Sequence, residues 1–259
     1  MRILNLGSGS KGNSTYIEYN DTAILLDCGI NITRVMDTLR RYNITRHIDG
    51  ILITHEHSDH IKHLVRYMNR FQTNVYITKE SFDNLPNYIY DYIDMNRIFF
   101  IEKEKKYKIK DMIFVALQLY HDTKDTVGYL IKMGNKNYSY MTDTGILPDK
   151  YLPLLQKMNY IMIESNHDVE MLLNSDRDYT LKQRILSDHG HLSNDQCAEI
   201  LEKVVNEKTK VIMLSHLSEE CNQVDIAYNT SKKVLDNKNS STKLLVLNQH
   251  TETLVEDND

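Results

Sequence analysis

The segment Gly50–His60, GILITHEHSDH, joins a mainly apolar run to a cluster of imidazoles and carboxylates. An apolar run of this length is typical of a buried strand. The residues that follow it have the pattern H-x-H-x-D-H, with candidate ligands at His55, His57, Asp59 and His60. Because His55 and His57 are alternate residues of a loop, they can turn the same way, while Asp59 and His60 face a neighbouring position. The spacing differs from the H-E-x-x-H motif of zinc proteases.

Imidazole nitrogens and carboxylate oxygens are ligands that suit Zn²⁺, Mn²⁺ or Fe²⁺. The segment offers four such donors within six residues. A single catalytic ion that keeps one coordination position open uses fewer protein ligands, so the segment favours two adjacent metal ions. We do not expect thiolates to contribute, because Cys28, Cys197 and Cys221 lie far apart without a C-x-x-C pair. The alternative interpretation is a polar loop that caps the next helix and holds no metal.

The composition is that of a globular chain with a substantial core. Among 259 residues, 41% are hydrophobic, and 31 Lys and Arg stand against 36 Asp and Glu, a formal net charge of −5. This charge excludes a polybasic coat for nucleic acid, although bound metal ions would attract phosphate locally. No apolar run approaches the roughly 20 residues of a membrane span, and no signal-peptide pattern follows Met1. We therefore expect a cytoplasmic protein, not associated with membranes, with a single domain over residues 1–259.

Strands and helices are expected to alternate in two strand-rich halves. Strand patterns occur at Arg2–Leu6, Thr15–Tyr19, Thr22–Asp27, Gly50–Thr54, Asn74–Thr78, Met112–Tyr120, Thr126–Met133, Lys136–Met141, Tyr160–Glu164, Lys210–Leu214 and Leu244–Leu247. Helix patterns occur after Ile32, over Ile61–Phe71, in the Tyr-rich stretch that ends at Asn96, over Asp149–Lys157, after the capping box Ser193–Gln196, and over Val224–Leu235. Two sheets packed face to face with helices outside would satisfy this order, which makes the fold class α+β.

The H-x-H-x-D-H segment after a strand resembles the metal motif of the metallo-β-lactamase fold, a four-layer αββα sandwich with a one- or two-metal site at its strand ends. Further residues match that family's pattern in the same order. They are Asp27 at the end of AILLD, His121 in LYHD, Asp143 in YMTDTG and His216 in VIMLSHLS. The resemblance therefore extends well beyond the first motif.

The resemblance implies a complete set of ligands for two divalent ions, Zn²⁺ or Mn²⁺. One ion would be held by His55, His57 and His121, and the other by Asp59, His60 and His216. Asp143 and a hydroxide would lie between the ions, and Asp27 would support a ligand histidine. Such a hydroxide is a nucleophile at neutral pH, because two dications depress its pKa.

One branch of the superfamily fits best. The stretches LGSGSKGNST, HEHSDH, HDTKDTVGY, TDTG, ESNHD, DHGHLSN and LSHLSEECN are similar to those of the YycJ/WalJ proteins, which are related to tRNA-processing and cyclic-phosphodiesterase members. The 73 residues from Asp143 to His216 are too few for the domain that the β-CASP nucleases insert there. LGSGSKGNS lacks the G-K-[ST] ending of a phosphate-binding loop, so we interpret it as a tight turn that lines the cleft.

His191, in GHLSN, corresponds in position to a histidine with which related phosphodiesterases protonate the leaving oxygen or contact phosphate. An imidazole can donate a proton near neutral pH, and the amides of a helix N-terminus favour phosphate. The alternative is a histidine that supports a ligand or caps the helix. His167 and His189 are further candidates for supporting the site or binding substrate. The Tyr-rich segment Tyr88–Tyr107 is interpreted either as a lip over the substrate or as packing.

The leading hypothesis is a dinuclear metal-dependent phosphodiesterase that acts on nucleic acid, as the resemblance to the branch implies. We expect a DNA exonuclease with a role in repair, with Asp59 and His191 as catalytic residues. One alternative is another hydrolase of this fold, acting on a thioester, lactone or β-lactam. Another is a metal-binding regulatory protein without turnover. DNA, RNA and small phosphodiesters stay open as substrates, as do the cleavage polarity and the oligomeric state.

Overall fold

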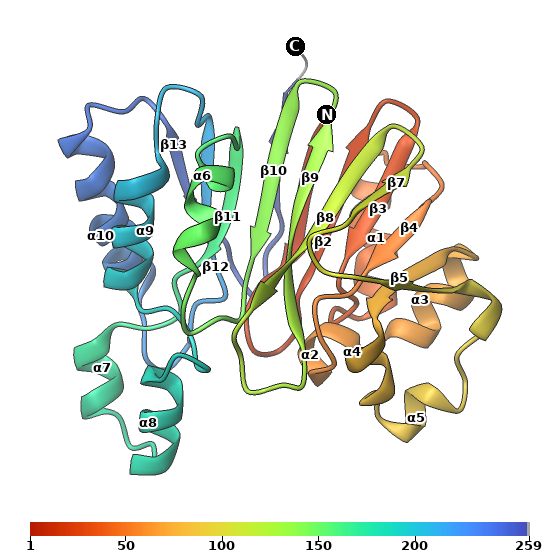
Figure 1. Cartoon of the computed structure of the whole chain (residues 1–259), viewed down its shortest axis with the longest axis horizontal. Helices are drawn as coiled ribbons and strands as arrows, with labels where there is room; N and C mark the ends of the chain where they lie inside the picture. The colour runs from red at the N-terminus through yellow and green to blue at the C-terminus, as the bar shows by residue number, and fades with distance from the viewer. Residues whose placement is uncertain (258–259) are drawn as a thin grey trace. The chain divides into compact units, whose positions relative to one another are not determined.

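The computed structural model describes residues 1–257 and shows strands and helices that alternate along most of the chain (Figure 1). The strands are β1 (Arg2–Gly7), β2 (Ser14–Tyr19), β3 (Thr22–Leu26), β4 (Gly50–Leu52), β5 (Asn74–Thr78), β6 (Ile98–Ile101), β7 (Lys106–Ile109), β8 (Met112–Leu119), β9 (Thr126–Met133), β10 (Lys136–Met141), β11 (Tyr160–Glu164), β12 (Val211–Ser215), β13 (Lys243–Val246) and β14 (Thr253–Glu256). The α-helices are α1 (Ile32–Arg41), α2 (Ser58–Ile61), α3 (Leu64–Phe71), α4 (Lys79–Asp83), α5 (Asn87–Tyr90), α6 (Leu152–Leu155), α7 (Val169–Asn174), α8 (Tyr179–Leu186), α9 (Asn194–Val204) and α10 (Val224–Asn237). Two 3₁₀ turns are η1 (Met95–Arg97) and η2 (Asp149–Tyr151).

These elements form two compact units. The first unit consists of Met1–Ala116, Thr123–Val127 and the chain from Asn248 onward, and the second of Leu117–Asp122 and Gly128–Leu247. Strands β8 and β9 each contribute residues to both units.

The sheet of the first unit has the strand order β14-β1-β2-β3-β4-β5-β6. Its first four strands pair antiparallel, and β3 to β6 pair parallel. Residues Leu25 and Ile51 of this sheet share a buried apolar core with Val35 of α1 and Leu64 of α3. Because parallel strands end at the same edge, the residues that follow β3 and β4 are brought together there. Those residues are Asp27 and the HEHSDH segment.

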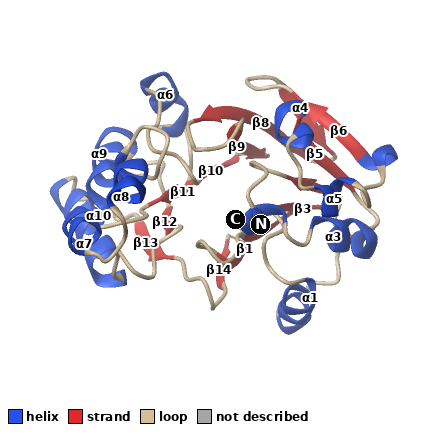
Figure 2. Cartoon of the chain, turned by 90° about the horizontal axis from the view of Figure 1, so that it is seen from below, coloured by secondary structure: helices blue, strands red, loops and turns tan. Residues whose placement is uncertain are grey.

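The second sheet has the order β13-β12-β11-β10-β9-β8-β7, with parallel pairing from β10 to β13. Helices α9 and α10 pack side by side, and α10 contacts β13 (Figures 1 and 2). Their buried faces include Leu201 and Leu235. The carboxyl ends of β10, β11 and β12 lie at one edge of this sheet, where Asp143, Glu164 and His216 are found.

The start of α9 confirms the capping box. Ser193 Oγ accepts a hydrogen bond from the Gln196 amide at 3.1 Å, and the Ser193 amide donates to Gln196 Oε1 at 2.9 Å. Two amides at the end of the helix are thereby satisfied. His191 lies three residues before Asn194, the first residue of α9.

Two of the expected helices differ in extent from the structure. Most of the helix expected over Ile61–Phe71 is present as α3, but α3 begins at Leu64 and is separate from α2, because the His63 amide donates to Cys28 O at 3.0 Å instead of continuing the helical pattern. The Tyr-rich stretch that ends at Asn96 contains only short helices. Pro86 lacks an amide hydrogen and precedes α5, which prevents one continuous helix through this stretch.

Several short elements were not predicted, or were predicted with other bounds. The helix expected over Asp149–Lys157 is the turn η2 followed by α6, which ends at Leu155. Strands β6, β7 and β14 and helices α7 and α8 were not expected. Each of these three strands has only four residues, and β6, β7 and β14 lie at the ends of their sheets. Short edge strands carry little of the alternation by which strands are recognised.

Candidate metal centre

The HEHSDH segment leaves the first sheet at the end of β4 and enters α2. His57 stands at the N-terminal cap of α2, and Asp59 and His60 lie in its first turns. His55 and His60 are fully buried. The rings of His55 and His57 are 4.8 Å apart, and those of His55 and His60 are 4.2 Å apart. Three imidazoles of the motif are therefore gathered at one edge of the first sheet.

Asp27 holds this part of the motif in place. One of its carboxylate oxygens, Oδ2, accepts a hydrogen bond from His60 Nδ1 at 2.8 Å, and the other, Oδ1, accepts from the Thr54 amide at 2.9 Å. The Thr54 hydroxyl lies 3.1 Å from both oxygens. With its Nδ1 hydrogen donated to a carboxylate, His60 has the tautomer whose Nε2 lone pair can bind a metal ion.

The loop that follows β3 and the loop between β1 and β2 are both clasped to the motif through backbone hydrogen bonds. The Cys28 amide donates to His60 O at 2.6 Å, and the Asn13 amide donates to Asp59 O at 2.8 Å. A Cβ atom at Gly29 would lie 1.6 Å from Asp59 O, so only glycine fits at this position. Asn13 Nδ2 also donates to Asp59 Oδ2 at 3.0 Å. The LGSGSKGNS segment thus supports Asp59, as well as forming a tight turn.

The second unit gathers another donor cluster. Asp143, Glu164, His191 and His216 each offer a ligand atom, and these atoms lie within 4.8 Å of one another. His216 Nε2 is 3.5 Å from Asp143 Oδ1, and His216 Nδ1 is 3.1 Å from Glu164 Oε1. The cluster is built at the ends of β10, β11 and β12 and from the loop before α9.

His121 lies close to this cluster. Its Nε2 is 3.7 Å from Asp143 Oδ1 and 3.1 Å from Asp122 Oδ1, while Nδ1 is 3.0 Å from the carbonyl oxygen of Gly190. Burial lowers the pKa of His121, although the charge of Asp143 acts in the opposite direction. Burial therefore favours the neutral imidazole, the form that binds a metal ion.

Three expected ligand histidines share one arrangement. Nδ1 of His60 faces Asp27, Nδ1 of His121 faces the Gly190 carbonyl, and Nδ1 of His216 faces Glu164. In each case an acceptor fixes the ring through Nδ1, so Nε2 is the nitrogen suited to coordination. Histidines that bind metal ions in proteins are typically oriented in this way. The donor set and its orientation therefore fit divalent ions with nitrogen and oxygen ligands.

Three residues that follow strands have backbone angles rarely seen outside glycine. Asp27, Asp143 and His216 have φ values of 59°, 55° and 55°. Such left-handed conformations cost free energy and are concentrated at functional sites. At these positions the chain leaves a strand and places a polar side chain at the sheet edge.

His191 is the most exposed member of the cluster, with 18% of its side chain accessible. Its Nδ1 is 2.7 Å from Glu164 Oε1. Burial would raise the pKa of Glu164, but the charge of His191 and hydrogen bonds from His191 and His216 outweigh burial and lower it. Glu164 is thus an ionised carboxylate that can accept hydrogen bonds from both imidazoles.

The two remaining histidine candidates, His167 and His189, have different environments. His167 is 1% exposed, and neither ring nitrogen has a hydrogen-bond partner within residues 1–257. Burial lowers its pKa to about 4, which keeps it neutral. His189 is exposed and stands edge-on to Tyr120, with ring centroids 5.7 Å apart. Neither side chain belongs to the group of four donors in the second unit.

Sequence reasoning left two supporting residues without a role. Glu164 ends an expected buried strand, as Asp27 does, and that position was the signal that could have identified it. Asn13 lies in the LGSGSKGNS segment, and its side chain is 3.0 Å from both Asp59 Oδ2 and His60 Nε2. No spacing rule connects Asn13 with a motif 46 residues away.

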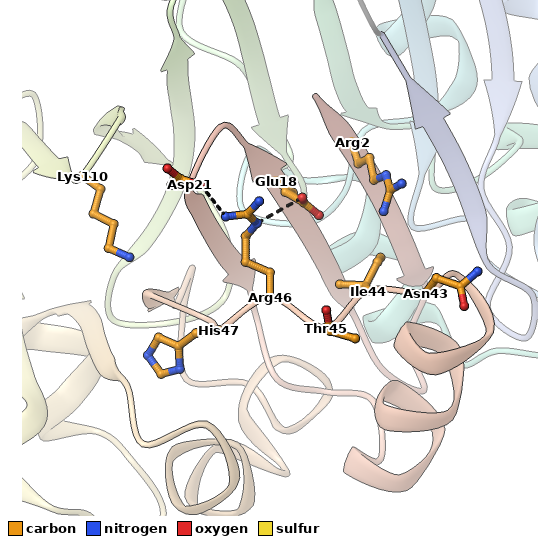
Figure 3. A pocket seen from close by; sticks show the side chains of 9 residues that line it. All are labelled: Arg2, Glu18, Asp21, Asn43, Ile44, Thr45, Arg46, His47 and Lys110. Atoms are coloured by element: carbon orange, nitrogen blue, oxygen red, sulfur yellow. Dashed lines mark hydrogen bonds and ion pairs between the residues drawn. The ribbon is translucent and has the colours of Figure 1, made fainter.

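Figure 3 shows a pocket of about 430 Å³ in the first unit, and no residue of the HEHSDH motif lines it. It contains Asp21, which precedes β3, whereas Asp27 follows that strand at its other end. Its Arg46 is paired with Glu18 and Asp21, at 3.1 Å and 2.9 Å. Since Arg2 and Lys110 are also paired with carboxylates, the arginine and lysine side chains of this pocket are already neutralised by neighbouring carboxylates.

Comparison with known proteins identifies the class. Residues 22–216 match the model of the beta-lactamase superfamily domain, so the chain belongs to that superfamily. It is a metal-dependent hydrolase of this class, as the sequence predicts. Within residues 1–257, no helix combines the length and the apolar character that crossing a bilayer requires.

Two relatives of this chain are named as exodeoxyribonucleases. Exodeoxyribonuclease WalJ from Streptococcus pneumoniae serotype 2 (strain D39 / NCTC 7466) is 34% identical over 227 residues, which is 87% of this chain and 84% of the relative. Exodeoxyribonuclease YycJ from Bacillus anthracis is 32% identical over 236 residues, 90% of this chain and 88% of the relative. The resemblance to the YycJ/WalJ branch is thereby confirmed.

A solved structure supports the fold. The metallo-beta-lactamase fold protein YhfI from Bacillus subtilis matches with a TM-score of 0.72 at 15% identity, over 97% of this chain and 98% of the other. This likeness confirms the expected α+β fold class, the sandwich of the metallo-β-lactamase fold.

Proposed function

We propose that the protein is a dinuclear metal-dependent phosphodiesterase that acts on DNA as an exonuclease. The observation that carries the proposal is the shared orientation of His60, His121 and His216, whose Nδ1 atoms each face an acceptor. Hydrolases of the beta-lactamase superfamily with this motif use metal ions, and relatives at 32–34% identity are named exodeoxyribonucleases. DNA is therefore the substrate that we favour over RNA.

We assign the ligands of the two ions, Zn²⁺ or Mn²⁺, as the resemblance implies. His55, His57 and His121 would hold one ion, and Asp59, His60 and His216 the other, with Asp143 shared between them. When bound, the ions lower the pKa of a water molecule and neutralise negative charge on the phosphate. Because this set draws on both units, we propose that residues 1–259 act as one hydrolase domain. We also keep the cytoplasmic location as part of the proposal.

His191 is proposed to protonate the leaving oxygen. Its Nδ1 can donate to Glu164 Oε1 at 2.7 Å, and this contact fixes the orientation of the ring. When both ring nitrogens carry hydrogen, Nε2 has a proton that it can transfer to an alkoxide. The start of α9, three residues further on, adds backbone amides that favour a phosphate nearby.

The test compares substrates and variants with the metal-loaded protein. Linear DNA, nicked DNA, single-stranded RNA, bis-p-nitrophenyl phosphate and nitrocefin are incubated with Mn²⁺ and Zn²⁺ in parallel. We expect DNA hydrolysis that falls more than about 100-fold in Asp59→Ala, since loss of a ligand should exceed the usual effect of losing a supporting residue. Turnover of nitrocefin without diester cleavage would contradict the proposal, and preference for RNA would correct the substrate.

The role of His191 is tested through the leaving group. Removal of a general acid typically costs about 10²–10⁴ in rate. We expect this loss in His191→Ala for DNA, whose alkoxide is a poor leaving group, and a much smaller loss for the p-nitrophenyl diester. Equal losses for both substrates would show that His191 supports the site and does not donate the proton.

A further inference from the structure

A groove of about 420 Å³ adjoins the metal motif within the first unit. Its walls come from α2, α3, the residues between them, and the Tyr-rich segment at α5. The lining residues are Ser58, Lys62, His63, Val65, Arg66, Tyr88, Ile89 and Tyr92. Ser58 lies between His57 and Asp59 of the motif. The groove is therefore continuous with the segment that supplies the candidate ligands.

The groove is positively charged, although the chain carries a net charge of −5. Lys62 and Arg66 are exposed, and neither side chain has an ion-pair partner within residues 1–257. The lining contains no Asp or Glu. Burial, followed by the charges of Arg66 and Lys62, lowers the pKa of His63 between them. Two unpaired cations thus face a groove whose own walls offer no counter-charge.

Two tyrosine side chains of the groove are exposed to solvent. Tyr88 is 55% exposed and Tyr92 is 73% exposed. Their hydroxyl groups have no hydrogen-bond partner in the part of the chain that the structure describes. Between them Ile89 is 1% exposed and packs in the apolar core, which fixes the short helix α5 to the unit. The exposed rings therefore stand on an anchored support.

We propose that this groove binds a single-stranded segment of the DNA substrate beside the metal motif. Lys62 and Arg66 contact phosphates, and Tyr88 and Tyr92 stack on bases. Proteins that hold single strands without reading their sequence combine a positive groove with exposed aromatic rings in this way. Bases within a duplex are already stacked on one another, so the groove selects a single strand. This inference rests on the proposed function for the identity of the substrate.

Binding is measured first, by fluorescence anisotropy with an oligothymidine of about 12 nucleotides. EDTA is present so that the strand is not cleaved. We expect Tyr88→Ala and Tyr92→Ala each to weaken binding by about 5- to 160-fold, since one stacked base contributes about 1–3 kcal/mol. Tyr92→Phe keeps the ring and retains most of the affinity. A blunt duplex of the same length binds more weakly and is less affected.

The charge of the groove is tested by the salt dependence. The variant Lys62→Ala/Arg66→Ala loses two cations, so the slope of log affinity against log salt concentration should fall by about 1.4. Arg70→Ala is the matched control, because Arg70 is exposed on the same helix but does not line the groove. Tyr179→Ala, at a tyrosine of α8 that is 74% exposed, is the control for the aromatic variants. Both controls should bind like the unaltered protein.

The outcomes separate this inference from the proposed function. If the Mn²⁺-loaded protein cleaves DNA while the groove variants bind oligothymidine like their controls, the groove is overturned and the nuclease assignment stands. If the groove variants lose binding but the unaltered protein cleaves no DNA, the groove stands and the nuclease assignment fails. If the groove variants lost binding to the duplex but not to oligothymidine, the inference would also be overturned, because the groove would then bind double-stranded DNA.

Discussion

At the scale of single residues, the candidate site depends on how side chains are oriented as much as on which side chains are present. Asp27 fixes Nδ1 of His60 and also accepts two hydrogen bonds from Thr54. The position of Asp27 at a strand end was visible in the sequence, but its contact with Thr54 was not. Such contacts depend on the parallel pairing of β3 with β4, which residue spacing alone does not determine.

Replacing Asp27 by Asn should weaken metal binding without unfolding the chain. The amide keeps the size of the side chain but removes the charge that favours an Nδ1–H tautomer at His60. We expect affinity for Zn²⁺ to fall about 10- to 100-fold, as for other residues that orient ligands. Competition with a coloured chelator measures the affinity. Asp37→Asn, at an exposed carboxylate of α1, is the control, and equal affinities in both variants would contradict the role of Asp27.

The three cysteines should be unreactive in the folded protein. Cys28, Cys197 and Cys221 are free and buried. Burial raises the pKa of Cys197 to about 12, so its reactive thiolate is scarce near neutral pH. We expect no rapid reaction with a thiol reagent at about pH 8, and reaction of all three thiols after denaturation. Rapid labelling of the native protein would show that the loops around these residues open.

At the scale of elements, strand ends and loops do most of the positioning. The sequence predicted β4, β11 and β12 because their runs are apolar, and it predicted the start of α9 from a capping box. It failed in the Tyr-rich stretch, where Pro86 and tertiary packing of Ile89 produce short helices. It also failed at His63, whose amide is taken by Cys28 O. Helical periodicity cannot reveal a hydrogen bond to a distant loop.

Gly29→Ala tests the clasp between the loop after β3 and the motif. The new methyl group would lie within 1.6 Å of Asp59 O, so the loop must move. We expect a loss of stability of about 1–3 kcal/mol, together with weaker metal binding. Denaturant unfolding and chelator competition measure the two effects. The control is Gly134→Ala, at a turn with φ of 61°, which should also lose stability but keep its metal affinity. If Gly29→Ala likewise lost stability without any loss of metal affinity, the proposed link between this loop and the motif would be contradicted.

Ser193→Ala tests the start of α9 near His191. Loss of the Ser193 hydroxyl leaves the Gln196 amide without its capping acceptor. We expect a loss of about 1 kcal/mol in the free energy of unfolding, measured by denaturant titration. Ser193→Thr, which keeps the hydroxyl, should recover most of this loss. Unchanged stability in the alanine variant would mean that the cap contributes little to the fold.

At the scale of the whole molecule, family membership and the donor clusters point to the same chemistry. The superfamily match covers residues 22–216, a range that contains every proposed metal ligand. Each unit contributes its own donors, fixed by its own sheet: Asp27 orients His60 in the first, and Glu164 orients His216 in the second. The ligand set stays a prediction that rests on the order of the motifs, whereas the supporting contacts of Glu164 and Asn13 are visible only in three dimensions.

In the proposed enzyme this ligand set holds two ions, and the protein hydrolyses DNA. The most direct measurement is the metal content per chain, by mass spectrometry of the Mn²⁺- or Zn²⁺-loaded protein, followed in the same samples by the rate of DNA hydrolysis. We predict two ions per chain, fewer in Asp59→Ala, and hydrolysis that rises as the second ion binds. Full activity with one ion per chain, or two ions without cleavage of any phosphodiester, would contradict the account.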